Sequence, residues 1–350
     1  MRTKEEISEL INHIQTKENR EIKFDEEAIL KAYSENDNHQ TLAIKILSIF
    51  GGFLASSIFV GFLFLAGLYD SEFALLLLGF LLIVFGAFIN QQNDNTIVDT
   101  VSISAYIIGF ILLGMGFSKM ELDENTISLI FIFIAFCTLF LTQAYIISFV
   151  SVLIISGSFL TLLISNDYYD LVHVYVSVMA VLLSLIFLNE AKLLNGNSKI
   201  SKLYSPVRIA LLFSFLAGLI ILGKTGILKL SQEYLWISSI SIVIAIFSVV
   251  SRLLVLLNIH ENKWKIYALA TIVLLPTLFA PSISGAILII LLSFLVNYKT
   301  SLVIGAVVFI YFVSQYYYDL HYTLLTKSIV MFCSGILFLG LFFLTQKKLK

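Results

Sequence analysis

The chain has 350 residues, of which 59% are hydrophobic and only 13% are charged, and its formal net charge is −1. Soluble domains are typically about 45–50% apolar and about 25% charged. The composition therefore excludes a water-soluble globule, a disordered chain and a disulfide-rich scaffold. The near-neutral charge argues against nucleic acid as a partner. We predict an all-α polytopic transmembrane helical bundle.

Residues 1–41 form a charged segment that precedes the first apolar run. Thr3 and Glu6 have the spacing of a helix capping box, and apolar residues then recur with helical period. The segment holds six Lys and Arg against ten Asp and Glu, so it is not a polybasic lipid anchor. We predict a short cytoplasmic helical segment that docks on the bundle, and the alternative is a segment that binds a partner.

From residue 42 onward, apolar runs alternate with short polar turns. A spanning helix needs about 20 largely apolar residues, with a range of roughly 17–25. Twelve spans are predicted, at residues 44–68, 73–89, 101–118, 126–142, 144–165, 171–188, 207–223, 235–257, 266–280, 282–296, 302–318 and 323–344.

Two stretches need interpretation. Residues 126–165 are too long for one crossing, so Thr142 and Gln143 mark a turn between two spans. Residues 266–296 are interrupted by Pro276 and Pro281. They form either a tight hairpin of full spans or a re-entrant pair buried in protein.

The distribution of Lys and Arg predicts the orientation. With twelve spans, 18 of the 22 Lys and Arg residues fall on the side of the N-terminus. These residues are enriched in cytoplasmic loops of membrane proteins. We therefore expect both termini to be cytoplasmic.

The helices divide into two halves, at 42–188 and 207–346, joined by a cytoplasmic linker at 189–206. Residues 166–171 precede span six, and the similar residues 316–320 precede span twelve. This similarity indicates a parallel repeat of six plus six spans. The alternative is an ordinary belt of tyrosines at the membrane interface.

Motifs for chemistry are scarce in the sequence. It contains no HExxH, GxSxG or Walker-type loop, and Cys137 and Cys333 both lie inside apolar runs. We therefore expect no catalytic residue, no metal site and no cofactor. No predicted span carries a central Asp or Glu, which argues against a proton-coupled carrier but leaves a facilitator or a lipid-handling protein.

One polar constellation remains, at the outer ends of spans six and twelve. Asp319, Thr323 and Lys327 would share one stripe of a helix, and Asp170 and His173 would share another face. The candidate outer polar site comprises Asp170, His173, Tyr316, Tyr317, Tyr318, Asp319, Thr323, Lys327 and Ser328. The alternative is an aromatic belt with one structural salt bridge.

Residues 316–328 also carry a resemblance to a known family. They read Tyr-Tyr-Tyr-x-Leu-x-x-Thr-Leu-Leu-x-Lys-Ser and precede a span with Gly335. This resembles the C-terminal signature of the bacterial membrane family catalogued as domain of unknown function 4401. A looser similarity covers Asn93–Asp99 and Gly109, where Ile97 and Phe110 depart from the family pattern.

The resemblance implies a multi-pass inner-membrane protein, often encoded beside another multi-span protein and a small exported protein, with no established activity. It extends over residues 40–345. The motif positions that it would carry over are Tyr316, Tyr317, Tyr318, Leu320, Thr323, Leu324, Leu325, Lys327 and Ser328, of which Leu324 and Leu325 are interpreted as packing residues.

Two functions follow as the main hypotheses, and a third, an integral-membrane enzyme, is less favoured because the sequence has no paired acid–base or nucleophile signature. The first is a transporter-like carrier or facilitator of a lipid or small solute, with membrane lipid as its partner. The second is a non-catalytic membrane scaffold or subunit of an envelope complex, which would bind another multi-span membrane protein or an exported partner.

Overall fold

The computed structural model describes residues 42–89, 96–142, 144–195, 198–224, 226–257 and 263–319, together with isolated positions between 325 and 340. Within these residues every regular element is a helix and none is a strand, which confirms the all-α prediction. The helical segment predicted at 1–41 and most of the twelfth predicted span lie outside the described residues.

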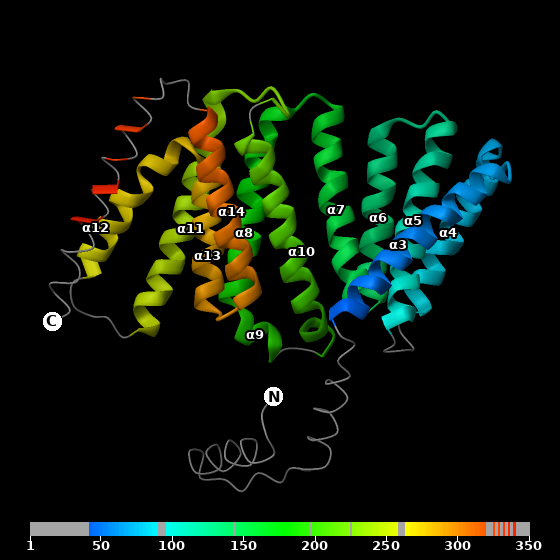
Figure 1. Cartoon of the computed structure of the whole chain (residues 1–350), viewed down its shortest axis with the longest axis horizontal. Helices are drawn as coiled ribbons and strands as arrows, with labels where there is room; N and C mark the ends of the chain where they lie inside the picture. The colour runs from blue at the N-terminus through cyan, green and yellow to red at the C-terminus, as the bar shows by residue number, and fades with distance from the viewer. Residues whose placement is uncertain are drawn as a thin grey trace, which may run out of the picture.

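The long helices run side by side, and successive ones alternate in direction (Figure 1). Four short 3-10 turns lie between them: η1 (Leu68–Asp70), η2 (Tyr169–Leu171), η3 (Gln232–Tyr234) and η4 (Pro276–Phe279). The helices are α3 (Leu42–Leu65), α4 (Glu72–Ile89), α5 (Thr96–Lys119), α6 (Glu124–Leu141), α7 (Tyr145–Ser165), α8 (Val172–Leu188), α9 (Glu190–Leu194), α10 (Ser198–Gly223), α11 (Leu235–Leu256), α12 (Lys263–Leu274), α13 (Pro281–Leu295) and α14 (Lys299–Asp319).

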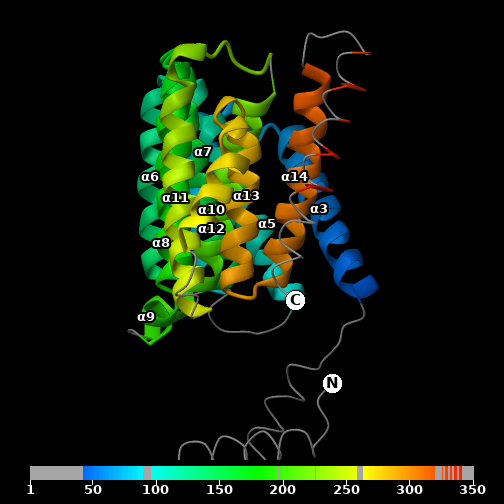
Figure 2. The same ribbon diagram turned by 90° about the vertical axis from the view of Figure 1, so that its left-hand side faces the viewer.

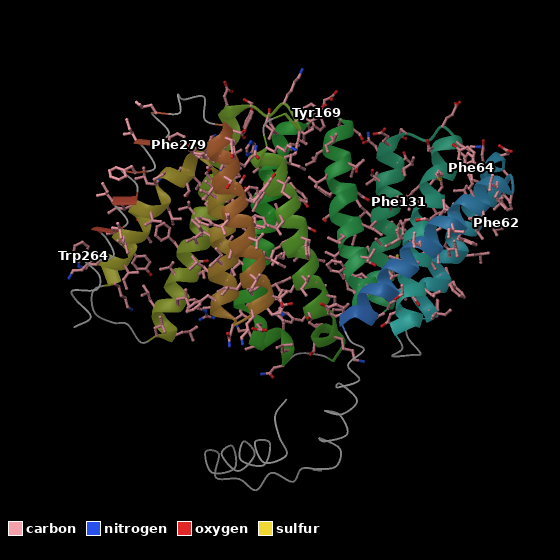
Figure 3. All side chains as sticks on the ribbon, in the orientation of Figure 1. Phe62, Phe64, Phe131, Tyr169, Trp264 and Phe279 are labelled. Carbon is pink, nitrogen blue, oxygen red and sulfur yellow. The ribbon has the colours of Figure 1, made fainter. Side chains whose placement is uncertain are left out.

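Among the described residues, eight helices are long and apolar enough to cross a membrane. They are α4, α5, α6, α7, α8, α10, α11 and α14. Large apolar side chains lie exposed around them, including Phe62 and Phe64 at one lateral edge and Trp264 at the other (Figure 3). Such a surface is stable only against hydrocarbon, so the fold is that of a multi-pass membrane protein.

The turn predicted at Thr142 and Gln143 is confirmed by the break between two helices at Thr142, while Gln143 lies outside the described residues. The apolar stretch divides into α6, which ends at Leu141, and α7, which begins at Tyr145. The Thr142 hydroxyl donates a hydrogen bond to the carbonyl oxygen of Thr138 at 2.9 Å, so a polar group at the helix end is satisfied locally.

The break at the two prolines is also confirmed. Pro276 opens η4 and Pro281 opens α13, positions where the missing backbone N–H costs nothing. The helices on either side have 12 and 15 residues. At 1.5 Å per residue they rise about 18 and 22 Å, less than the roughly 30 Å of a bilayer core.

One expectation about local structure differs from what is observed. The linker expected at 189–206 is largely helical, because α9 and the first turns of α10 occupy it and Pro206 lies within α10. Polar residues at a membrane interface can extend a helix into water. Residues 316–318, predicted as the end of the span at 302–318, lie in the last turn of α14 together with Asp319.

The two ends of the bundle carry opposite charge. We call the end with the start of α3, α9 and the α13–α14 turn the cationic end, and the other the acidic end (Figure 1). Nine of the twelve described Lys and Arg are at the cationic end: Lys45, Lys192, Lys199, Lys202, Arg208, Arg252, Lys263, Lys265 and Lys299. Nine of the eleven described Asp and Glu are at the acidic end: Asp70, Glu72, Glu121, Asp123, Glu124, Asp167, Asp170, Glu233 and Asp319.

The largest buried apolar cluster joins α7, α8, α10, α11, α13 and α14. Figure 2 shows α14 and α3 on one face of the bundle, and α6, α8 and α11 on the other. Serine hydroxyls bond across these interfaces: Ser156 meets Ser214 between α7 and α10 at 2.6 Å, and Ser241 donates to Ser177 between α11 and α8 at 2.8 Å. Such bonds fix helix pairs inside a membrane, where hydrophobic association is weak.

Glycines allow α4 and α5 to pack backbone to backbone. A Cβ atom built on Gly86 would lie 2.5 Å from the carbonyl oxygen of Ser102, and one on Gly109 would lie 2.7 Å from that of Gly79. Because both obstacles are backbone atoms, this pair of helices can approach so closely only with glycine at these positions.

Candidate functional site

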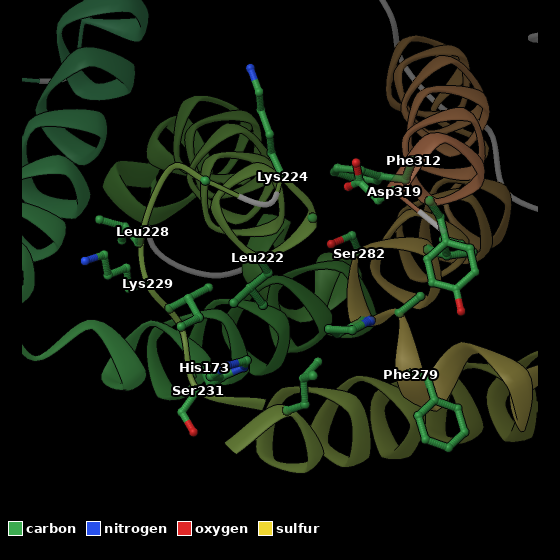
Figure 4. Close-up of a pocket in the computed structure, with 18 residues that line it drawn as sticks. His173, Leu222, Lys224, Leu228, Lys229, Ser231, Phe279, Ser282, Phe312 and Asp319 are labelled. Atoms are coloured by element: carbon green, nitrogen blue, oxygen red, sulfur yellow. The ribbon is translucent and has the colours of Figure 1, made fainter. Parts of the chain in front are cut away.

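A cavity of about 470 Å³ lies at the acidic end of the bundle, between α8, α10, α11, α13 and α14. Its volume is within the range of about 300–1,000 Å³ that is typical of ligand sites. The apolar side chains that line it include Leu222, Leu228, Leu230, Leu235, Phe279, Ile283 and Phe312. Its polar lining includes His173, Lys224, Lys229, Ser282, Tyr316 and Asp319 (Figure 4).

His173 lies in the first turn of α8 and is only 1% exposed. Its Nδ1 atom forms a hydrogen bond of 2.9 Å with the Ser238 hydroxyl on α11. Its Nε2 atom has no partner within the described residues. Leaving a buried polar atom unpaired costs about 1–3 kcal/mol. Since His173 lines the cavity, a polar group that enters the cavity can supply the missing hydrogen bond.

The pairing of His173 with Ser238 is not a nucleophile–base arrangement that a substrate in the cavity could reach. Ser238 is fully buried, and its hydroxyl also donates to the Leu235 carbonyl oxygen at 3.1 Å. Ser238 is absent from the residues that line the cavity. The bond therefore orients the imidazole and joins α8 to α11.

The loop between α10 and α11 forms one wall of the cavity. Lys224, Gly226, Leu228 and Lys229 all line it, and Gly226 has a φ angle of 98° that favours glycine. Asp170 lies outside the cavity, just before α8, and accepts a hydrogen bond from the backbone N–H of Ser231 at 2.8 Å. Asp170 therefore positions the loop rather than contacting the cavity.

One face of α14 forms the wall of the cavity that lies opposite this loop. Phe312, Tyr316 and Asp319 are spaced at i, i+4 and i+7, and all three line the cavity. The Gln315 side-chain amide donates to both carboxylate oxygens of Asp319, at 3.1 and 3.2 Å. Two aromatic rings and an acid thus face one space.

The residues predicted for the site divide into three groups. His173, Tyr316 and Asp319 come together at the cavity, and Asp170 supports its loop. Tyr317, Tyr318 and Ser328 do not line it, and Tyr318 is 76% exposed. Thr323 and Lys327 lie outside the described residues, as does the helical stripe that would join them to Asp319.

Sequence reasoning missed the lysines of the cavity wall and Ser282. The signal for Lys224 and Lys229 was present, because they are two of the few cations on the acidic side of the charge pattern. Nothing in the sequence pointed to Ser282. It reaches the cavity because Gly223 lets the end of α10 approach α13: a Cβ atom at Gly223 would lie only 2.7 Å from the Ser282 hydroxyl oxygen.

A second polar cluster surrounds Arg208 at the cationic end. Its side chain is 8% exposed, and its Nη1 atom donates to Glu190 at 3.2 Å and to the Tyr204 hydroxyl at 3.1 Å. The guanidinium carbon lies 4.2 Å from the ring centroid of Tyr298, in the turn before α14. Arg208 therefore joins α9, α10 and the α13–α14 turn, and is enclosed rather than extended to water as a residue near a span end would be.

The described residues contain no group of three His, Cys, Asp or Glu side chains placed to hold a metal ion. Comparison with protein families gives one result: the model of a domain of unknown function, DUF4401, matches residues 41–348. The chain belongs to this family. The resemblance carried by residues 316–328 is thereby confirmed. No curated protein and no solved structure matches the chain.

Proposed function

We propose that this protein is a membrane carrier or facilitator that binds a lipid or another small amphipathic solute in the cavity at the acidic end. The observation that carries the proposal is the buried imidazole of His173, which lines the cavity and whose Nε2 atom is unpaired among the described residues. A binding site for an amphipathic molecule combines apolar walls with a few convergent polar groups, and this cavity has both.

We further propose that both termini lie in the cytoplasm and that the cavity lies at the outer face of a bacterial cytoplasmic membrane. The chain then crosses the bilayer twelve times if α12 and α13 form a tight hairpin of short spans, and ten times if they form a re-entrant pair. The charge difference between the two ends supports this orientation, because Lys and Arg gather at one of them. The family resemblance supports a bacterial inner membrane. Under this orientation a ligand reaches the cavity from the outer leaflet or from the periplasm.

A lipid-transfer assay tests the proposal. The full chain is reconstituted in vesicles that contain a fluorescent phospholipid, and dithionite bleaches the label that reaches the outer leaflet. We expect wild-type protein to accelerate transbilayer movement over protein-free vesicles. Leu228→Trp should reduce the rate toward that of protein-free vesicles, because a larger side chain on the cavity wall fills the site.

The matched control is Ile227→Trp. Ile227 is the neighbouring residue of the same loop, is 44% exposed and does not line the cavity, so this variant should transfer lipid like wild type. Equal rates for the two tryptophan variants, or no acceleration by the wild-type chain, would contradict the proposal.

A further inference from the structure

The polar residues of the cavity are divided by charge between its two walls. Lys224 and Lys229 belong to the loop after α10, whereas Asp319 belongs to α14. Figure 4 shows Lys229 and Asp319 on opposite sides of the cavity, with the side chains of Lys224 and Lys229 extending outward from the loop. No ion pair between these lysines and Asp319 is formed within the described chain. Each wall can therefore offer its charge to a ligand.

The α14 wall has the composition of an ammonium site. Phe312 and Tyr316 present aromatic rings on the same helix face as the Asp319 carboxylate. Aromatic faces attract cations through their quadrupole, and a carboxylate adds a charge-assisted hydrogen bond to a primary ammonium. Within the described chain, Asp319 is hydrogen-bonded to the side-chain amide of Gln315. Because this amide is neutral, the bond does not neutralise the negative charge of Asp319.

The loop wall suits an anionic group. Lys224 and Lys229 are both exposed, and each can reach an anion with a flexible ammonium. His173 also lines the cavity, and its buried Nε2 atom has no hydrogen-bond partner among the described residues. A ligand that bridged the walls would need a cation toward α14 and an anion toward the loop.

The apolar lining indicates where the rest of such a ligand would lie. Phe279 is 75% exposed and lines the cavity next to Pro281 and Ile283. It therefore joins the cavity to the apolar perimeter of the bundle. A cavity of about 470 Å³ holds a headgroup but not two acyl chains as well, so the chains would extend past Phe279 into the bilayer.

We infer that the cavity selects a zwitterionic amphiphile, with a primary ammonium against Phe312, Tyr316 and Asp319 and a phosphate toward Lys224 and Lys229. Phosphatidylethanolamine has this chemistry, and so does free phosphoethanolamine. The inference rests on the proposed function, because it names the class of molecule that the same cavity would bind.

A binding competition with the full chain in mild detergent tests the inference. The probes are phosphatidylethanolamine, the anionic lipid phosphatidylglycerol and soluble phosphoethanolamine. We expect wild type to prefer phosphatidylethanolamine over phosphatidylglycerol by about tenfold, the effect of one good charge-assisted contact. Asp319→Asn should remove this preference.

Two further variants guard against a simple folding effect. Glu233→Gln changes another acid at the same end, which is exposed and does not line the cavity, and it should keep the wild-type preference. Lys229→Gln lies on the exposed loop and should weaken phosphatidylethanolamine binding several-fold without disturbing the helices. If phosphoethanolamine binds as tightly as phosphatidylethanolamine, the cavity selects a zwitterion, and its ligand is a soluble molecule rather than a lipid.

Two results would overturn the inference in different ways. If both lipids bind equally to wild type and Leu228→Trp displaces both, the cavity holds lipid without selecting a zwitterion, and only this inference fails. If Leu228→Trp displaces no probe, the cavity binds none of them, and the proposed function fails with it.

Discussion

The carboxylate of Asp170 and the backbone N–H of Ser231 are joined by a hydrogen bond of 2.8 Å, which ties the start of α8 to the end of the loop after α10. This loop contributes both lysines of the cavity wall. Because a loop between helices has few other fixed contacts, one charge-assisted bond to its backbone can decide its position.

We predict that Asp170→Ala loosens this loop and lowers ligand affinity several-fold. Hydrogen exchange at the amides of residues 226–231 should become faster, because Ser231 loses its acceptor. Asp170→Asn keeps a side-chain oxygen at the same place and should remain close to wild type in both measurements. Equal exchange in all three proteins would show that Asp170 does not position the loop.

The glycine contact between α4 and α5 yields a prediction about stability. In Gly86→Ala the new methyl group would lie 2.5 Å from the Ser102 carbonyl oxygen, so the two helices must separate. Overpacking of this kind typically costs about 1–3 kcal/mol. The free energy of unfolding, measured by titration from a mild detergent into a denaturing one, should fall by this amount.

Gly157→Ala is the matched control for Gly86→Ala. Gly157 also lies inside a long helix, α7, but a Cβ at this position meets no atom within 4 Å. Alanine is favoured over glycine in a helix by roughly 0.5–1 kcal/mol, so this variant should be slightly more stable than wild type. A similar loss in both variants would mean that close packing of α4 and α5 is not the cause.

The N-cap of α6 predicts a dependence on pH. Asp123 accepts hydrogen bonds from the Thr126 hydroxyl at 2.5 Å and from the Thr126 backbone N–H at 3.2 Å. These bonds, chiefly the one from the hydroxyl, hold the pKa of Asp123 below its usual value. A carboxyl with a lowered pKa in the folded state stabilises the fold above its unfolded pKa of about 3.9. This contribution is lost as the pH falls through the folded pKa.

Asp123→Asn removes the titration and retains a capping oxygen. We expect wild type to have the higher thermal midpoint in detergent at pH 6, and the difference between the two proteins to shrink toward pH 3. A difference that stays constant over this range would contradict the proposed role of the carboxylate.

The helices could be predicted from the sequence because each local signal agrees with the fold. The polar residues at Thr142 and Gln143 interrupt a long apolar run, and the chain turns there. Pro276 and Pro281 lack the N–H groups that a continuous helix needs, and each opens a new element. Within a membrane these signals are strong, because backbone groups must be paired inside their own segment.

The site could be predicted only in part, because its residues come together through packing between distant helices. His173 and Asp319 were both candidates from the interfacial pattern, and both line the cavity. Periodicity could not reveal that the loop with Lys229 forms another wall of the same cavity, since the path of a loop depends on contacts such as that of Asp170 with Ser231. Nor could it show that Arg208 is enclosed by Tyr298 from another hairpin.

The enclosed Arg208 gives the last prediction, because its geometry distinguishes arginine from lysine. One guanidinium nitrogen bonds both Glu190 and Tyr204, while the central guanidinium carbon lies over the Tyr298 ring. A lysine keeps the charge, but its compact ammonium cannot stack on the ring and reach both oxygens. Arg208→Lys should therefore lower the free energy of unfolding by about 1–3 kcal/mol, the range for an impaired buried charged contact.

Two comparisons decide the role of Arg208. Lys202→Gln removes a charge from the exposed face of the same helix and should change stability by less than about 0.5 kcal/mol. Glu190→Gln leaves the buried guanidinium without its counter-charge, so it should destabilise the fold in the same direction as Arg208→Lys. If Arg208→Lys is as stable as Lys202→Gln, the contact of the guanidinium with Tyr298 contributes nothing to stability, and this position requires only a positive charge.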